Sequence, residues 1–530
     1  MSQACRGRPA WARPAGTVPA APAHRMGHHG GVPTTDVDRA SARVGGPGEH
    51  RALGVGVLRG LPGPDSIWWL VIVAAAFIAA ELAFVPAHSG LGWDEVVYVS
   101  QVSRHAAASQ FVSARARGVS LLVAPVTLLT SSIVVLRVYL SVVSGLALFG
   151  ALLVWRRFRP AWVLALAGLA LGSLWIVQYY GPRAMPNLWF ALSGLAAVGF
   201  FLRAAAKLGP DDPGQGRAWA VLTGLAACLA FAALMRPGDA AFLAVPLVGA
   251  ALVVRPWRRW RLVVATVTGP LAGASEWLIE AFVRSGGAFS ALHSAAGEQG
   301  SFGLHLGVWA ELRALNGPVI CRRNCTVGWE HPQLSVWWLA LPVLVALGLA
   351  AARRAGRLQS AALAAICALS AALQYLFLIN YAAPRFLIPV YTLLAVPVAD
   401  GLAWLVTGVR AELRLVTGAL VAACLVLQVV SQHEVLMQQA TAPGNGYGRA
   451  AADLHRLGVD PPCLVKGTQY IPIAFYAGCA SAPSLAASAP AVRIAVLGRP
   501  GAPPPAYAQG WHGYRLAGTR LVAYLPHARP

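Results

Sequence analysis

The chain has 530 residues, of which 57% are hydrophobic and only 20 are Asp or Glu. Charged residues make up 12% of the sequence, about half of the share usual in soluble globular proteins. This composition excludes a single soluble domain and indicates a protein that crosses a membrane several times. The net charge of +22 would also suit a nucleic-acid-binding protein. However, most arginines stand in short clusters between apolar runs, a pattern that reflects membrane topology, and we expect no nucleic-acid partner.

The first 62 residues are rich in Arg, Pro, Gly, Ala and His and have no apolar periodicity, which predicts a disordered tail. Apolar segments follow along most of the remaining chain, and a membrane helix needs roughly twenty such residues. We predict an all-α polytopic membrane protein with eleven transmembrane helices. The predicted spans are 66–86, 133–155, 161–179, 186–204, 217–235, 238–254, 261–283, 335–352, 360–380, 385–406 and 413–432.

Four basic clusters, at 155–160, 255–261, 351–357 and 409–414, fall on one side of this topology. By the positive-inside rule that side is cytoplasmic, so the chain is predicted to be a multi-pass protein of the cell membrane. Three parts then follow. They are a cytoplasmic tail (1–62), a membrane domain (63–435) with outer loops at 87–132 and 284–334, and an extracytoplasmic domain (440–530). The last part alternates helical and strand patterns, which predicts a small α/β domain.

Cysteine positions agree with this topology. Cys321 and Cys325 lie in the second outer loop, and Cys463 and Cys479 lie in the C-terminal domain. An oxidising compartment allows disulfides to persist there, so we predict the pairs 321–325 and 463–479. Four free thiols are the alternative.

Arginines also occur at the predicted outer ends of spans, against the positive-inside bias: Arg117, Arg183, Arg236 and Arg385. Ionisable residues at membrane depth indicate a functional site by default. Guanidinium groups match phosphate oxygens bidentately, so together these arginines suit the phosphate of a lipid headgroup. The alternative is that each one extends separately to the membrane interface.

An acidic pair, Asp94 and Glu95, follows the first predicted span in "GWDEVVYVSQ". A carboxylate beside a bound substrate can act as a general base, and one carboxylate suffices for an inverting sugar transfer when the leaving group is a phosphate. The two acids could also cap the helix that the sequence predicts here. We expect Asp94 to be the base and Glu95 to orient the helix or bind a cation.

A second acidic pair, Glu276 and Glu280, has helical i,i+4 spacing in the outer part of the seventh span. These two carboxylates could bind a divalent cation, line an acceptor groove, or only be shielded near the interface. No His-rich motif with metal-ligand spacing occurs. Mg²⁺ or Mn²⁺ is therefore a candidate cofactor that the sequence does not decide.

The order of these motifs resembles the GT-C glycosyltransferase superfamily, above all its family-39-like and lipid A aminoarabinose-transferase-like members. The resemblance covers about residues 66–410 and includes the acidic pair in the first outer loop. "RGVSLLVAP" (117–125) resembles the family's "KPPL" region, although it lacks the double proline. "YYGPRAMPNLWFALSGLAAVGFFLRA" (179–204) resembles its "R-x-x-x-P-D" span, with Asn187 where many relatives have Asp. "APRFLIPVYTLLAVPVADGL" (383–402) resembles its "RY-x-x-P" segment.

The resemblance implies transfer of a sugar, a hexose or a pentose, from a polyprenyl-phosphate donor to a lipid, glycan or protein acceptor outside the cytoplasmic membrane. It also implies that Asp94 is the base and that Arg385, followed by Arg183, Arg117 and Arg236, contacts the donor phosphate. Asn187 weakens any expectation of a second acid or metal ligand at that position.

Two other functions stay open. A transporter or flippase of a lipid-linked sugar would typically show paired repeats and polar residues near the membrane midplane. A non-catalytic envelope scaffold would depend on its C-terminal domain and not on the acidic pair.

Overall fold

A computed structural model of the protein describes residues 63–208, 215–298, 303–315, 332–441, 446–482 and 493–526. The predicted N-terminal tail and the predicted pair Cys321–Cys325 lie outside these ranges, as does part of the second predicted outer loop.

Within the described ranges, eight helical segments are long and apolar enough to cross a membrane. They contain α4 (Ile133–Trp155), α7 (Pro186–Lys207), α8 (Gln215–Met235), α10 (Trp260–Ser285), α13 (Val336–Arg354), α14 (Leu358–Leu373), α15 (Ile388–Thr407) and α16 (Arg414–Thr441). Three other predicted spans coincide with shorter apolar helices, α1 (Trp68–Phe84), α5 (Ala161–Gly172) and α9 (Pro237–Val253). The multi-pass helical membrane domain is therefore confirmed, whereas the count of eleven crossings stays a prediction.

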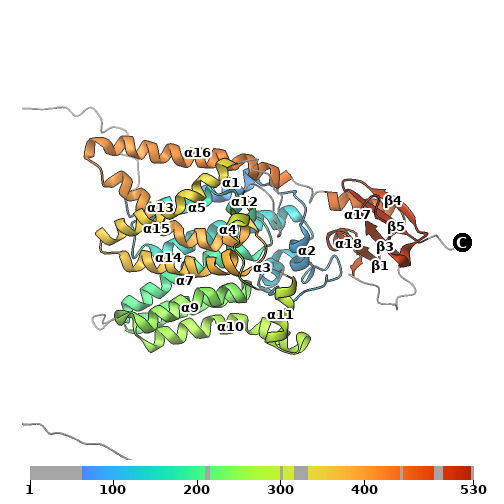
Figure 1. Cartoon of the computed structure of the whole chain (residues 1–530), viewed down its shortest axis with the longest axis horizontal. Helices are drawn as coiled ribbons and strands as arrows, with labels where there is room; N and C mark the ends of the chain where they lie inside the picture. The colour runs from blue at the N-terminus through green and yellow to red at the C-terminus, as the bar shows by residue number, and fades with distance from the viewer. Residues whose placement is uncertain are drawn as a thin grey trace, which may run out of the picture. The chain divides into compact units, whose positions relative to one another are not determined.

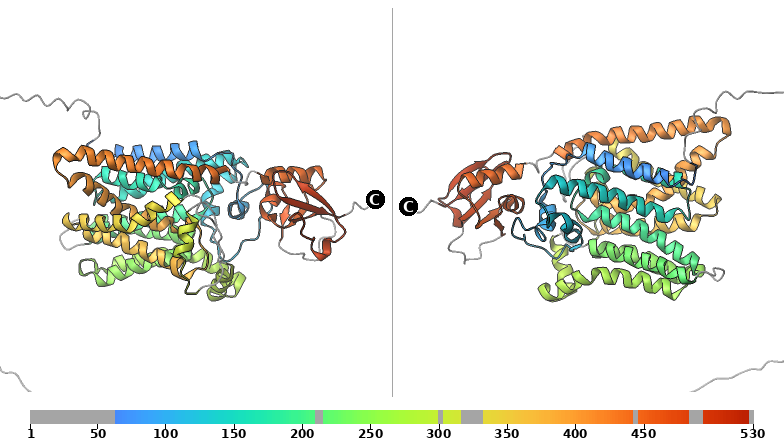
Figure 2. Two further views of the ribbon diagram at one scale, coloured as in Figure 1. Left: turned by 45° about the horizontal axis from the view of Figure 1, so that its top comes forward. Right: turned by 180° about the vertical axis from the view of Figure 1, so that it is seen from behind.

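The long helices run side by side in one bundle (Figures 1 and 2). The most apolar stretches of α15 and α7 are 89% and 78% buried, whereas the corresponding stretch of α16 has no buried residue. Helix α16 lies along one edge of the bundle (Figures 1 and 2). Glycine lets the central helices approach closely. A Cβ added at Gly348 of α13 would lie 1.8 Å from the carbonyl oxygen of Pro397 in α15.

Short elements connect the long helices: α2 (Trp93–Ser100), α3 (Gly118–Thr127), α6 (Trp175–Tyr180), α11 (Ala288–Glu298) and α12 (Val308–Ala314). The last turn of α14 continues as a π-helical turn, η4 (Gln374–Leu378), and the 3₁₀ turn η5 (Pro384–Leu387) precedes α15. Further 3₁₀ turns are η2 (Arg255–Trp257), η3 (Pro332–Ser335), η6 (Ala411–Leu413) and η8 (Ala506–Ala508). We call the end of the bundle that carries α2 the α2 end.

The C-terminal residues form a small α/β domain, as predicted. Its elements are α17 (Gly446–Arg456), β1 (Cys463–Gly467), α18 (Tyr470–Tyr476), β2 (Ala480–Ser481), β3 (Arg493–Gly498), β4 (His512–Leu516) and β5 (Leu521–Leu525). The sheet order is β2-β1-β3-β5-β4, in which β1 pairs in parallel with β2 and β3, while β5 is antiparallel to β3 and β4. The predicted disulfide between Cys463 and Cys479 is present.

One helix of this domain packs against the α2 end. Ile471 and Phe475 of α18 belong to the same apolar cluster as the membrane helices. The amide of Leu91, just before α2, donates to the Tyr476 hydroxyl at 2.7 Å, and Trp93 meets Tyr470 edge to face at 5.3 Å. The start of α2 is thus held by the C-terminal domain.

Candidate active site

The acidic pair lies in the first turn of α2, where carboxylates oppose the positive end of the helix dipole. Gly92 is the N-cap residue, and its amide donates to Glu95 Oε2 at 3.0 Å. This contact is the Glu half of a capping box. The predicted helix and its capping acid are therefore both present. The side chains of Asp94 and Glu95 project from the same turn into different surroundings.

Glu95 is buried, with only 2% of its surface exposed. It forms an ion pair with Arg137 of α4 and accepts from Arg183 Nη1 at 3.0 Å and from the amide of Ala184 at 2.9 Å. Burial alone would raise the pKa of Glu95, but the Arg137 and Arg183 guanidinium groups outweigh it and lower the pKa to about 2. Glu95 is therefore a permanently charged anchor inside the protein.

Arg137 is the partner that sequence reasoning missed. It is 1% exposed, and besides Glu95 it donates to the carbonyl oxygens of Gly90 at 3.0 Å and Pro182 at 2.9 Å. It thereby ties the loops before α2 and before α7 to the start of α4. The only signal in the sequence is one arginine among apolar residues in "IVVLRVYLS".

Asp94 is the more accessible acid, with its side chain 30% exposed. Its Oδ1 accepts from Arg115 Nη2 at 2.6 Å, and its Oδ2 lies 3.4 Å from Arg385 Nη2. Burial raises the pKa of Asp94, whereas Arg385 and Arg115 lower it, and the net result is a pKa below the ordinary value. The carboxylate is therefore ionised at neutral pH.

Aromatic residues hold two of the predicted phosphate-binding arginines near Asp94. Arg385 donates to the Tyr180 hydroxyl and lies 5.2 Å from the centre of the Phe386 ring. Arg236 lies 5.4 Å from the same ring and forms an ion pair with Asp239 at 2.6 Å. The two guanidinium groups thus stand on one aromatic ring at the α2 end.

The other two predicted arginines have different surroundings. Arg183 holds Glu95 and stacks on Tyr179 at 3.9 Å, while its Nε has no hydrogen-bond partner in the described part of the chain. Arg117 turns to the second acidic pair, at 2.9 Å from Glu280 and 3.3 Å from Glu276. Arg385 therefore contacts Asp94 and Arg183 contacts Glu95, whereas Arg236 shares only the Phe386 ring with Arg385 and Arg117 is committed to α10.

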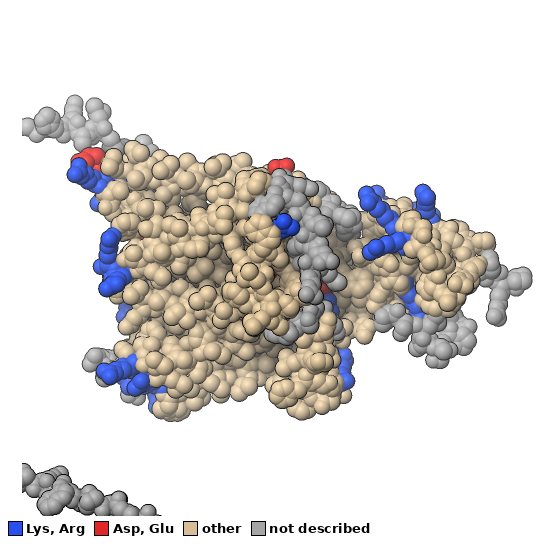
Figure 3. Space-filling view, in the orientation of Figure 1, with Lys and Arg blue, Asp and Glu red and all other residues tan. Residues whose placement is uncertain are grey.

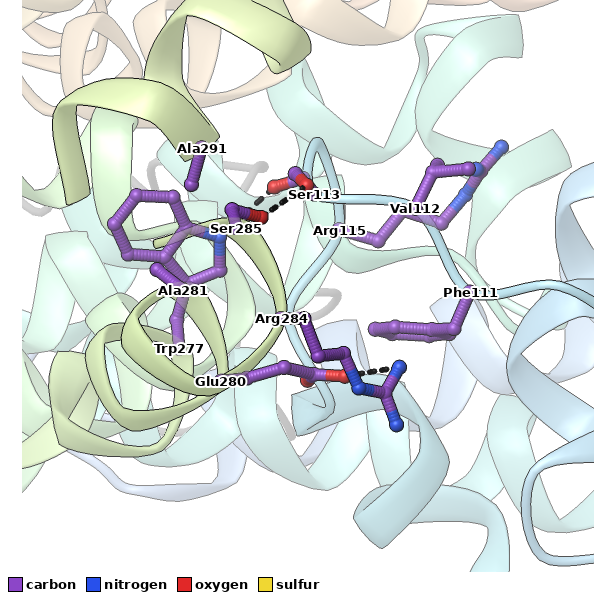
Figure 4. Close-up of a pocket in the computed structure, with 10 residues that line it drawn as sticks. All are labelled: Phe111, Val112, Ser113, Arg115, Trp277, Glu280, Ala281, Arg284, Ser285 and Ala291. Carbon is purple, nitrogen blue, oxygen red and sulfur yellow. Dashed lines mark hydrogen bonds and ion pairs between the residues drawn. The ribbon is translucent and has the colours of Figure 1, made fainter. Parts of the chain in front are cut away.

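The second acidic pair fastens the first loop to α10. Glu280 also forms an ion pair with Arg284 at 2.6 Å, and Trp277 Nε1 donates to the carbonyl oxygen of Ser113 at 2.9 Å (Figure 4). These residues surround a cavity of about 30 Å³, which has space for no more than a few water molecules. The neighbourhood of Glu276 and Glu280 is thus a clamp between chain segments.

Two further polar residues at this end are buried with unused hydrogen-bonding atoms. Neither amide atom of Asn187 has a partner among the described residues, although its side chain is fully buried. Glu311 of α12 accepts from the amide of Ala383 and leaves Oε1 without a partner there. Burial raises the pKa of Glu311 well above its ordinary value, although the Ala383 amide and the Arg385 guanidinium act to lower it. A buried Glu311 with a raised pKa beside the Arg385 segment was not predicted, because a single acid in a predicted loop carries no pattern.

The carboxylates at the α2 end do not fit a divalent cation. Such an ion needs several free oxygen ligands, whereas both oxygens of Asp94 and of Glu95 already face N–H groups. No group of three His, Cys, Asp or Glu side chains that could hold a metal ion occurs within the described ranges. Mg²⁺ or Mn²⁺ stays a candidate cofactor that the sequence left undecided and that Asp94 and Glu95 do not favour.

The helix bundle and the C-terminal α/β domain have a fold similar to that of ArnT, in agreement with the GT-C type of fold predicted from the sequence. ArnT from Cupriavidus metallidurans bound to undecaprenyl phosphate is similar, with a TM-score of 0.61 at 15% identity over 87% of this chain and 99% of that chain. The structure of the same ArnT in the apo state has a TM-score of 0.61 at 14% identity, over 86% of this chain and 97% of that chain. ArnT is an aminoarabinose transferase of the GT-C superfamily.

The archaeal oligosaccharyltransferase AglB from Archaeoglobus fulgidus, in complex with an inhibitory peptide and a dolichol-phosphate, has a TM-score of 0.49 at 13% identity over 78% of this chain and 64% of that chain. No family model matches the sequence, and no curated protein matches it.

The two acids of α2 should respond differently to the loss of charge. In Glu95→Gln, Arg137 stays buried without its ion pair, which should lower the free energy of unfolding by about 3–5 kcal/mol. In Asp94→Asn the lost contacts are half-exposed, and the change should stay within about 1 kcal/mol. Thermal unfolding of the two purified variants checks this. Equal melting temperatures would contradict the assignment of Glu95 as the structural anchor.

Proposed function

We propose that this protein is a membrane glycosyltransferase that moves a sugar from a polyprenyl-phosphate donor to an extracytoplasmic acceptor, with inversion at the anomeric carbon. The observation that carries the proposal is Asp94, an accessible carboxylate held between Arg115 and Arg385 and beside a fully buried Glu95. The fold is that of ArnT, one structure of which contains undecaprenyl phosphate, a lipid of the proposed donor class.

The arginines near Asp94 support a donor that carries a phosphate. Arg385 and Arg236 both lie over the Phe386 ring, and Arg183 Nε has no hydrogen-bond partner in the described part of the chain. Guanidinium groups bind phosphate oxygens in pairs and oppose the negative charge that grows on the leaving group. We assign the donor phosphate to Arg385 first, and then to Arg236 and Arg183.

The reaction needs one base and one stabilised leaving group. An acceptor hydroxyl attacks the anomeric carbon and gives its proton to Asp94. The bond between the anomeric carbon and the phosphate oxygen breaks, and that oxygen keeps the electron pair as polyprenyl phosphate departs. A single displacement from the opposite face inverts the sugar, which can be a hexose or a pentose.

Donor binding would also tune the base. In the structure Arg385 and Arg115 lower the pKa of Asp94, which makes it a weak base. A donor phosphate that takes over Arg385 would withdraw part of this positive charge, and the pKa of Asp94 would rise. The carboxylate would then become more basic only when a donor is bound.

The proposed orientation follows from the arginine-rich loops opposite the α2 end, which the positive-inside rule assigns to the cytoplasm. The α2 end and the C-terminal domain would then be extracytoplasmic. The acceptor would be a lipid, glycan or protein that reaches Asp94 there.

Replacing the base should remove transfer without removing the protein. Asp94→Asn should lower the transfer rate by about 10²–10⁴-fold, because the acceptor hydroxyl loses its proton acceptor. The measurement incubates membranes with labelled polyprenyl-phosphate sugars and follows the label into product. Asp65→Asn, an exposed acid at the other end of α1, is the matched control and should keep full activity.

Full transfer by Asp94→Asn would overturn the assignment of the base. A scaffold would instead lose its function on deletion of 440–530 and be indifferent to Asp94→Asn. A flippase would move the labelled lipid across the membrane without breaking its bond to the sugar.

The acid limb of the pH profile should report Asp94. Its pKa is below the ordinary value of about 4, so kcat/KM should hold on acidification until the pH falls below that value. Arg385→Gln removes a positive charge from Asp94 and should move this limb to higher pH, besides raising KM for the donor. Arg104 is an exposed arginine in the loop that follows α2, and Arg104→Gln should leave the limb in place. An unmoved limb in Arg385→Gln would contradict the assignment of this limb to an Asp94 whose pKa Arg385 lowers.

A further inference from the structure

A large cavity lies at the end of the bundle opposite α2. Helix α4 begins beside Glu95 and runs for 23 residues, about 34 Å, before the chain turns into the loop that lines this cavity. Two more loops meet it there, the one between α9 and α10 and the one between α13 and α14. Basic side chains gather at this end of the bundle (Figure 3). The cavity measures about 680 Å³ and is therefore well separated from the proposed active site and far larger than a few water molecules.

Four arginines from these three loops line the cavity: Arg157, Arg159, Arg259 and Arg357. Arg159 is only 2% exposed. Its Nε donates to both carboxylate oxygens of Asp400 at 2.7 and 2.8 Å, and its Nη1 donates to Ser360 Oγ at 3.0 Å. Its Nη2 is buried and has no partner in the described part of the chain. The Nε atoms of Arg259 and Arg357 are buried without a partner there as well.

Among the described residues, the positive charge of the cavity exceeds the negative charge of the carboxylates in contact with it. Asp400 accepts from Arg159 and lies 3.9 Å from Arg357, so this one carboxylate faces two guanidinium groups. Burial and the neighbouring charge of Arg159 lower the pKa of Arg357, in spite of Asp400. Like charges are thus held close together, which an anion between them would relieve.

We propose that this cavity binds the phosphate of an anionic phospholipid headgroup. Unused guanidinium N–H groups from three loops can converge on phosphate oxygens, and arginine holds such groups bidentately. Phe158, Leu202 and Trp257 supply apolar wall that a bare phosphate would not need but a glycerol backbone would contact. Basic pockets between membrane helices are a known setting for anionic headgroups.

Membrane topology alone does not account for this arrangement. Arginines that only mark the cytoplasmic side can extend into water, as exposed Arg353 and Arg410 do at the same end. Arg159 is instead buried, and Arg259 and Arg357 are half-buried, with N–H groups turned away from solvent. Burying the N–H groups that have no partner among the described residues is unfavourable unless a further acceptor, such as a phosphate oxygen, reaches them.

The test measures the thermal unfolding of the purified full-length protein with phosphatidylglycerol, with phosphatidylcholine and with inorganic phosphate. Phosphatidylglycerol should stabilise the protein in a concentration-dependent way and phosphatidylcholine should not. The double variant Arg259→Gln/Arg357→Gln should bind phosphatidylglycerol at least about tenfold more weakly than the wild type, because two charge-assisted hydrogen bonds are lost. Arg353→Gln, an exposed arginine in the last turn of α13 and outside the cavity, is the matched control and should bind like the wild type.

If inorganic phosphate stabilised the protein as much as phosphatidylglycerol does, the site would bind phosphate, but its ligand would be a free anion and not a lipid headgroup. No difference between the two phospholipids, or an equal loss in Arg353→Gln, would overturn the proposal. Counting the phospholipids that stay bound in native mass spectrometry gives a second readout, which does not depend on the stability of the variants. The double variant should retain fewer anionic lipids than Arg353→Gln.

Discussion

The buried ion pair between Glu95 and Arg137 fixes the geometry of the α2 end. Arg137 comes from α4 and also holds the carbonyl oxygens of Gly90 and Pro182, so one guanidinium joins three segments that are distant in sequence. Such a pair is expensive to break, because either partner alone would be a buried charge. The first turn of α2 therefore has one position, and Asp94 is presented from a rigid support.

This support explains why two adjacent acids can have different tasks. Glu95 points into the protein and is saturated by N–H groups, whereas Asp94 stays accessible and shares Arg385 and Arg115. In the proposed reaction Arg385 serves the base and the donor phosphate in turn. The C-terminal domain contributes to this arrangement, because Tyr476 of α18 holds the chain just before α2.

The helical membrane fold, its C-terminal α/β domain and the disulfide between Cys463 and Cys479 were predictable, because hydropathy, strand patterns and cysteine placement are local signals. The acidic pair was found for the same reason. Arg137, Glu311 and the commitment of Arg117 to Glu276 and Glu280 were not predictable, because each depends on which distant segments meet. A single sequence records that an arginine lies in an apolar helix and not which carboxylate it reaches.

The most direct test of the account is the affinity of the purified protein for undecaprenyl phosphate, measured for the wild type and for Asp94→Asn. If Asp94 competes with the lipid phosphate for Arg385, loss of its charge frees the guanidinium. The account then predicts that the inactive Asp94→Asn variant binds the lipid at least as tightly as the wild type. Binding that is lost together with activity would contradict it, because Asp94 would then be part of the lipid site itself.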